Sequence, residues 1–132
     1  MKLEHFALNV ANPVAMAKWY AEHMEMKIVR QQNEAPYTHF IADNSGRIML
    51  EIYCNPADQV PAYHSMNALI VHLAYVSTDP DADKERLLAA GASYDTEVRL
   101  DDGTLLIMMR DPWGVAIQLC KRAVPMLLDK EA

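Results

Sequence analysis

Apolar and polar positions follow two periods along this chain, and together they predict eight strands and two helices. Helical spacing begins after Asn12-Pro13 and again after Asp79-Pro80, each a capping residue followed by a proline at the first helical position. The pattern predicts helices over about 13–24 and 80–90. Runs of alternating residues predict strands over 3–10, 27–32, 37–42 and 47–54, then over 68–77, 94–100, 104–110 and 115–121. The element order is β-α-β-β-β, written twice, which indicates an α+β fold.

The two halves repeat at one offset. His5 and His72 are 67 positions apart (72 minus 5), and Glu51 and Gln118 are separated by the same interval. The surrounding residues repeat too, with residues 3–7 over 70–74 and 50–52 over 117–119. We interpret the chain as a duplicated module in which four side chains able to bind a metal belong to one site.

Alternation along the strands predicts where these four side chains point. Phe6 and Leu8 point to one face of the first strand, which is apolar and which a helix would cover. His5 points to the opposite face, away from the helix. Glu51 alternates with Leu50 and Ile52 in the same way, and the second half repeats the arrangement with His72 and Gln118. All four are therefore expected on the helix-free face of a curved sheet.

Composition and charge narrow the possible functions. The chain has 132 residues, 52% of them hydrophobic, which suits one compact domain. Its net charge is −6 and its basic residues are scattered, so we expect no nucleic-acid partner, and no apolar run is long enough to suggest a membrane span. The first residues meet an acid and a histidine at once, which argues against a secretion signal and makes the cytoplasm the expected location.

The chain resembles the vicinal oxygen chelate superfamily, which contains glyoxalase I, extradiol dioxygenases, and bleomycin and fosfomycin resistance proteins. The resemblance covers about residues 2–122 and is carried by Leu3-Glu4-His5-Phe6-Ala7-Leu8-Asn9-Val10, Leu50-Glu51-Ile52-Tyr53, Val71-His72-Leu73-Ala74, and Asp111-Pro112-Trp113-Gly114 leading to Ile117-Gln118-Leu119. It implies a single glyoxalase-like domain in which two βαβββ modules form a U-shaped half-barrel cup. We divide the chain into module 1 (2–54), a connector (55–67), module 2 (68–122) and a tail (123–132).

The resemblance also implies a metal site. In that family a divalent ion is held by the first and fourth strands of each module, which corresponds here to His5, Glu51, His72 and Gln118. These donors suit Zn²⁺, Ni²⁺, Fe²⁺ or Mn²⁺. Gln118 departs from the glutamate usual in glyoxalase-like members, and an amide cannot accept a proton as a carboxylate does. Glu51 is therefore the candidate catalytic base. An empty site, with both histidines hydrogen-bonded in a binding cup, is the alternative.

Four further residues are candidates for substrate binding. Tyr37 and His39 are expected on the cup side of the third strand, where they could contact a ligand or simply line the sheet. Arg47 and Arg110 are the best available anchors for an anionic group. Tyr63 and His64 in the connector either close over the cup or lie in an exposed loop.

Three functions remain open from the sequence. The leading hypothesis is a glyoxalase-like, metal-dependent lyase or isomerase acting on a small oxygen-bearing substrate, with Glu51 moving the proton. The second is a non-catalytic protein that binds and sequesters a small molecule, as resistance proteins do. The third is an extradiol-type dioxygenase holding Fe²⁺ through His5, His72 and Glu51. A homodimer is expected, and whether one chain or two complete the cup stays open.

Overall fold

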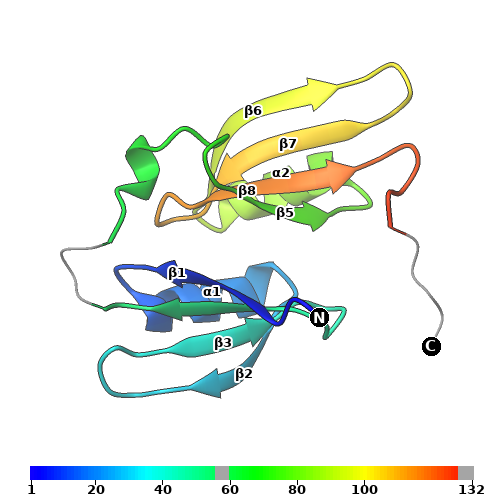
Figure 1. Cartoon of the computed structure of the whole chain (residues 1–132). Helices are drawn as coiled ribbons and strands as arrows, with labels where there is room; N and C mark the ends of the chain where they lie inside the picture. Colours follow the sequence, from blue (N-terminus) through cyan, green and yellow to red (C-terminus); the bar gives the residue numbers. More distant parts are fainter. Residues whose placement is uncertain (56–59, 128–132) are drawn as a thin grey trace. The chain divides into compact units, whose positions relative to one another are not determined.

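The computed structural model describes residues 1–55 and 60–127 (Figure 1). The chain separates into two compact units, Met1–Pro61 and Ala62–Ala132. Each unit contains one four-stranded sheet and one α-helix, in the order β-α-β-β-β. This confirms the predicted α+β fold of two equivalent modules. In the described part of the chain, no helix is both long enough and apolar enough to cross a membrane.

The first module contains a mixed sheet with its first strand at one edge. Its elements are β1 (His5–Asn9), α1 (Pro13–His23), β2 (Lys27–Gln31), β3 (His39–Ala42) and β4 (Met49–Tyr53). The strand order is β1-β4-β3-β2. β1 runs parallel to β4, and the other neighbours are antiparallel. The parallel pair is possible because α1 carries the chain from one end of the sheet back to the other.

The second module repeats this arrangement strand for strand. Its elements are a short 3-10 helix η2 (Tyr63–Ser65), β5 (Leu73–Val76), α2 (Pro80–Ala89), β6 (Ser93–Arg99), β7 (Leu105–Arg110) and β8 (Ala116–Lys121). The strand order is β5-β8-β7-β6, with β5 parallel to β8. Even the register repeats, because Ala7 pairs with Glu51 and Ala74 pairs with Gln118.

Local capping explains why both helices begin where the sequence predicts. The side chain of Asn12 accepts a hydrogen bond from the backbone N–H of Ala15 at 3.2 Å, and Asp79 accepts one from Ala82 at 3.1 Å. Each cap is followed by a proline, which has no N–H to leave unsatisfied at the first helical position.

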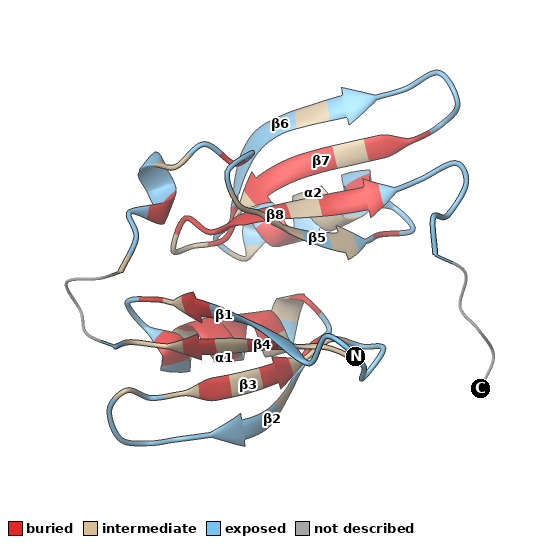
Figure 2. Cartoon of the chain, viewed as in Figure 1, coloured by how far each residue is buried: buried red, intermediate tan, exposed pale blue. Residues whose placement is uncertain are grey.

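Each module has its own core between the helix and one face of its sheet (Figure 2). In the first module Met16 and Tyr20 of α1 are buried with Ile41 and Ile52 of the sheet. In the second, Leu87 of α2 is buried with Ile107 and Ile117. The edge strands β2 and β6 are mostly exposed, so the central strands carry most of the apolar burial.

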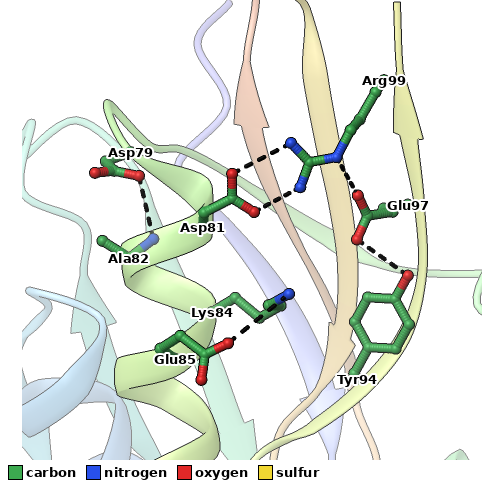
Figure 3. A network of polar contacts seen from close by, with 8 residues as sticks. All are labelled: Asp79, Asp81, Ala82, Lys84, Glu85, Tyr94, Glu97 and Arg99. Carbon is green, nitrogen blue, oxygen red and sulfur yellow. Dashed lines mark hydrogen bonds and ion pairs between the residues drawn. The ribbon is translucent and has the colours of Figure 1, made fainter.

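A charged network fastens α2 to the edge strand β6 (Figure 3). The Arg99 guanidinium donates to both oxygens of Asp81 on α2, at 2.6 and 3.2 Å, and it also donates to Glu97 on its own strand. Tyr94 donates to the other oxygen of Glu97 at 3.2 Å, and the Lys84 ammonium lies 5.5 Å from the centre of the Tyr94 ring. The network lies on the helix side of the second sheet.

Most predicted strands are shorter than the alternation indicated, and in two of them a turn explains the difference. The strand predicted over 37–42 begins only at His39, because Tyr37 has a left-handed backbone with φ of +58°. The strand predicted over 68–77 spans Leu73–Val76. Asn67 interrupts it by accepting from the Leu69 N–H through its side chain and from the Ile70 N–H through its carbonyl, which closes a turn.

The part of the connector from Ala62 onward packs on the second module, whereas Asn55 at its start exchanges hydrogen bonds with Asn9 of the first. Tyr63 is buried, and the carbonyls of Tyr63 and Met66 accept hydrogen bonds from Arg110 of β7 at 2.9 and 2.7 Å. Residues 56–59 of the predicted connector and 128–132 of the predicted tail lie outside the described residues.

Candidate functional site

His5 and Glu51 lie on one face of the first sheet. β1 and β4 are parallel neighbours, with His5 opposite Met49 and Ala7 opposite Glu51, so the side chains of these four residues share a face. His5 Nε2 lies 3.8 Å from Glu51 Oε1, and the two side chains are 38% and 21% exposed. The predicted face of both residues is confirmed.

The other ring nitrogen of His5 contacts the neighbouring Glu4 side chain. His5 Nδ1 lies 3.0 Å from Glu4 Oε1, and a carboxylate oxygen accepts, so Nδ1 is the donor. In the neutral ring Nε2 then carries a lone pair directed toward another acceptor, Glu51. A separation of 3.8 Å is too long for a hydrogen bond. It is close to the distance of about 3.4 Å between two ligands of one tetrahedral cation.

Phe40 also contacts this site, although alternation did not identify it. Its ring meets the His5 ring edge-on, with centroids 5.8 Å apart and planes at 86°. Phe40 pairs with Glu51 across β3 and β4, so it stands on the same face. The sequence pattern missed it because the start of β3 is displaced by the turn at Tyr37.

In the second module His72 makes an equivalent contact. His72 Nδ1 lies 2.8 Å from the carbonyl oxygen of Ala68, which can only accept, so Nδ1 is again the donor and, in the neutral ring, Nε2 is the acceptor. Ala68 is buried with Met108 and Ala116, which lie beside Gln118 on that face of the second sheet. The backbone carbonyl of the buried residue Ala68 thus orients the His72 ring.

Gln118 occupies the position of Glu51 in the second module. It pairs with Ala74 of β5 and is partly buried. Its side-chain oxygen accepts from Cys120 Sγ at 3.2 Å. Burial raises the pKa of the Cys120 thiol, against a smaller lowering by Arg122, so the sulfur keeps its proton and acts as the donor. The amide oxygen of Gln118 keeps a second lone pair.

Each module therefore contributes two of the four predicted metal donors. Within the described residues, neither module by itself gathers three or more His, Cys, Asp or Glu side chains that could hold a metal ion. His5 and Glu51 share the helix-free face of the first sheet, and Gln118 lies on the corresponding face of the second sheet, with His72 directly before β5.

The predicted position of His39 is wrong. His39 pairs with Ile52, so it points to the helix side of the first sheet and not to the face of Glu51. Only 3% of it is exposed, and its Nδ1 donates to the Tyr37 carbonyl at 2.7 Å. A ligand on the Glu51 face cannot reach a side chain buried on the opposite face, so His39 is a core histidine.

Tyr37 and Arg47 lie outside the strands. Tyr37 is 39% exposed in the loop before β3. Arg47 is exposed before β4, where its backbone N–H donates to Ser45 Oγ at 3.2 Å. Their predicted contact with a substrate stays a prediction.

Arg110 has a structural role that the sequence did not reveal. Its guanidinium donates to the carbonyls of Tyr63, Met66 and Gly114 at 2.7 to 3.2 Å and to the Asp95 carboxylate at 3.1 Å. A guanidinium has five N–H donors, and a further contact joins Nη2 to Asp95, so all of them face protein acceptors. The structure therefore does not support the predicted use of Arg110 as a substrate anchor.

Comparison with known proteins places the chain in a family. The sequence profile of the Glyoxalase/Bleomycin resistance protein/Dioxygenase superfamily matches residues 2–119. None of the curated proteins compared with the chain matches it.

Solved structures with the same fold include proteins of different activities. The antibiotic-binding protein TnmS3 from Streptomyces sp. CB03234 is 20% identical, with a TM-score of 0.70 over 91% of this chain and 94% of its own. Lactoylglutathione lyase from Agrobacterium tumefaciens is 18% identical, with a TM-score of 0.65 over 92% and 93%. A glyoxalase family protein from Enterococcus faecalis is 24% identical, with a TM-score of 0.69 over 91% and 97%.

At these identities the three structures establish the fold and leave the activity open. The profile match spans most of the chain, including both predicted histidines, Glu51 and Gln118. With the duplicated βαβββ modules, it shows that this protein belongs to the glyoxalase, bleomycin resistance protein and dioxygenase superfamily.

Proposed function

We propose that this protein is a metal-dependent lyase or isomerase that acts on a small oxygen-bearing substrate. The observation that carries the proposal is the state of the two histidines. In both, Nδ1 donates to an oxygen, Glu4 in one case and the Ala68 carbonyl in the other, so in the neutral ring Nε2 keeps its lone pair. Metal-binding histidines are oriented in this way by the partner of their second nitrogen.

The residues present fit a divalent cation. His5 and Glu51 would supply two donors, and His72 and Gln118, the donors of a second module, would complete the set. Two imidazoles, a carboxylate and an amide oxygen suit Zn²⁺, Ni²⁺, Fe²⁺ or Mn²⁺. Such a cation, when bound, polarises a carbonyl oxygen of the substrate and makes the adjacent C–H bond more acidic.

Glu51 is the residue that we propose moves the proton. Among the strand residues of the first sheet, it is the one carboxylate on the His5 face. It is partly open to solvent, with 21% of its side chain exposed, so a substrate can reach it. The Phe40 ring beside it covers part of the site and limits access of water to the reacting atoms.

Metal content and turnover test this proposal in three variants. His72→Ala should lose stoichiometric metal, while Glu51→Gln keeps the shape and an amide oxygen for ligation. Glu51→Gln should therefore retain more metal than His72→Ala and lose turnover by about a hundredfold or more. His23→Ala, a histidine on α1, is the control and should change neither quantity.

The measurements are metal analysis of untagged protein and turnover on 2-oxoaldehyde hemithioacetals and 2-substituted acyl thioesters, with each candidate metal added. Metal content that is the same in wild type, His72→Ala and Glu51→Gln would show that the ligands lie elsewhere.

A binding protein that sequesters a small molecule is the second candidate, and Gln118 favours it. A neutral amide stands where a second carboxylate would assist proton transfer, and its oxygen already accepts from Cys120. The similar fold of an antibiotic-binding protein is consistent with this role. If no substrate is turned over while a ligand protects the protein against unfolding, this candidate replaces the enzyme. The cytoplasmic location and the homodimer stay predictions.

A further inference from the structure

Two cationic side chains stand on the His5 and Glu51 face at the far edge of the first sheet. Strand pairing forms two rows across β1, β4, β3 and β2, and both rows end in a cation. One row is His5, Met49, Ala42 and Lys27, and the other is Ala7, Glu51, Phe40 and Arg30. Residues paired across neighbouring strands share a face, so Lys27 and Arg30 stand on the same side as the candidate metal donors.

A β-bulge turns Arg30 to this face. The pairing of β2 with β3 shifts between Ile28 and Arg30, so Val29 is an extra residue without a partner. In a regular strand Val29 would pair with Phe40 and Arg30 with His39, which would send the guanidinium to the helix side. The bulge moves Arg30 opposite Phe40 instead. Bulges commonly re-aim a side chain in this way beside functional sites.

Nothing in the described part of the chain neutralises these two cations. Neither Lys27 nor Arg30 makes an ion pair there, and both are exposed. The second module has a bulge at the matching place, between Tyr94 and Thr96, but its two rows end in hydroxyl groups, Ser93 and Thr96. Its arginine on this face, Arg110, is fully engaged. Free positive charge on this face is thus a property of the first module.

We infer that Lys27 and Arg30 bind a carboxylate of the substrate, and that the natural substrate is an anionic carbonyl compound. This inference rests on the proposed function, because it assigns the reacting end of the same substrate to His5 and Glu51. Two strand spacings separate Arg30 from Glu51, about 10 Å between Cα atoms. The side chains of Arg30 and Glu51 cover part of this distance, so a compound a few bonds long can contact both residues. The Phe40 ring lies between Arg30 and Glu51 and would contact the apolar middle of the compound.

Calorimetric titration with a matched pair of non-reacting ketones tests the inference. (Acetonylthio)acetate carries the carboxylate, and its amide has nearly the same shape without the charge. Wild type should bind the acid about tenfold or more tightly than the amide, and added salt should reduce this preference. Arg30→Gln should reduce the preference by about tenfold, whereas Arg30→Lys should keep part of it.

Lys18→Gln removes a cation on α1, on the opposite side of the sheet, and should leave the preference unchanged. An equal preference in wild type and Arg30→Gln, or no measurable binding of either ketone, would overturn the inference. Each titration is run with and without Zn²⁺. A preference that survives without any response to metal supports the anion site and counts against the proposed function, so the two can fail separately.

Discussion

Gly114 is a position where a single methyl group decides local packing. Its backbone has φ of +92°, and a Cβ added there would lie 2.6 Å from His64 Cγ and 2.7 Å from the His64 backbone nitrogen. Gly103 has a similar φ of +96°, yet nothing lies within 4 Å of an added Cβ. The two glycines share one backbone conformation and differ in the space around them, so they form a matched pair.

Gly114→Ala should lower the free energy of unfolding more than Gly103→Ala does. At Gly103 the cost is that of a left-handed backbone alone, about 1–2 kcal/mol. At Gly114 the overlap with His64 adds about 1–3 kcal/mol, because a backbone atom cannot rotate away. Urea unfolding of both variants measures the difference. Equal losses of unfolding free energy in the two variants would mean that His64 of η2 does not pack tightly against Gly114.

The sheet face on which His5 and Glu51 lie could be predicted from the sequence, but the positions and contacts of His39 and Arg110 could not. Strand alternation identified His5 and Glu51 because period two is a local property of the sequence. His39 was assigned to the wrong face because the turn at Tyr37 displaces the start of β3. The role of Arg110 depends on carbonyls more than 40 positions away in the chain, which no local pattern reveals.

At the scale of elements, the pairing of α2 with β6 gives the second module a pH-dependent contact. The hydrogen bond from Arg99 holds the pKa of Asp81 below its ordinary 3.8 and that of Glu97 below its ordinary 4.5. Groups with a lowered pKa in the folded state stabilise it above their unfolded pKa. That stabilisation is lost as the pH falls through the folded pKa values.

Arg99→Gln should therefore flatten the acid limb of the stability curve. Wild type and variant should differ in stability most above about pH 5, and they should converge once the pH falls below the lowered folded-state pKa values of both carboxyls. High salt should reduce the difference, because the network is exposed. Thermal unfolding from pH 2 to pH 7 measures it. Arg86→Gln removes one of the two partners of Asp83 on the same helix and is the control. A constant offset at every pH would contradict the assignment.

Helix boundaries were predicted to within one residue because their signals are local. Caps and prolines mark both starts, and Gly91 with φ of +101° follows the end of α2. The first module has Glu25 in this left-handed position, with φ of +54°, where its side chain accepts from Asn44 at 2.9 Å. The bulges at Val29 and Asp95 were not predicted, because an extra residue in a strand leaves no mark in the polar pattern.

At the scale of the whole molecule, the two modules share their strand register and bulges, as a duplication predicts, and they differ in charge. The pairing of Ala7 with Glu51 recurs as that of Ala74 with Gln118, and both modules have a bulge in the same edge strand. The repeated interval of 67 positions predicted this equivalence from the sequence. Charge did not follow the repeat, because Gln118 stands in the second module where Glu51 stands in the first, and Ser93 and Thr96 stand where Lys27 and Arg30 do.

Gln118→Glu tests whether the neutral amide at this position limits metal binding and catalysis. The substitution keeps the side-chain length, and a carboxylate oxygen can still accept from Cys120, so the fold should be retained. Without metal, a partly buried carboxylate has no cation beside it, so the variant should be less stable than wild type. With Zn²⁺ or Ni²⁺ added, a charged ligand binds the ion more strongly than an amide does, so the gain in melting temperature should exceed that of wild type. Gln118→Met removes the donor at similar volume and should give the smallest gain.

The order Glu, Gln, Met in metal-dependent stabilisation, with isomerase turnover rising in the Glu variant, would identify position 118 as a metal ligand whose charge limits catalysis. The same gain in all three proteins would exclude it from the metal site and would leave His5, Glu51 and His72 as the ligands to test.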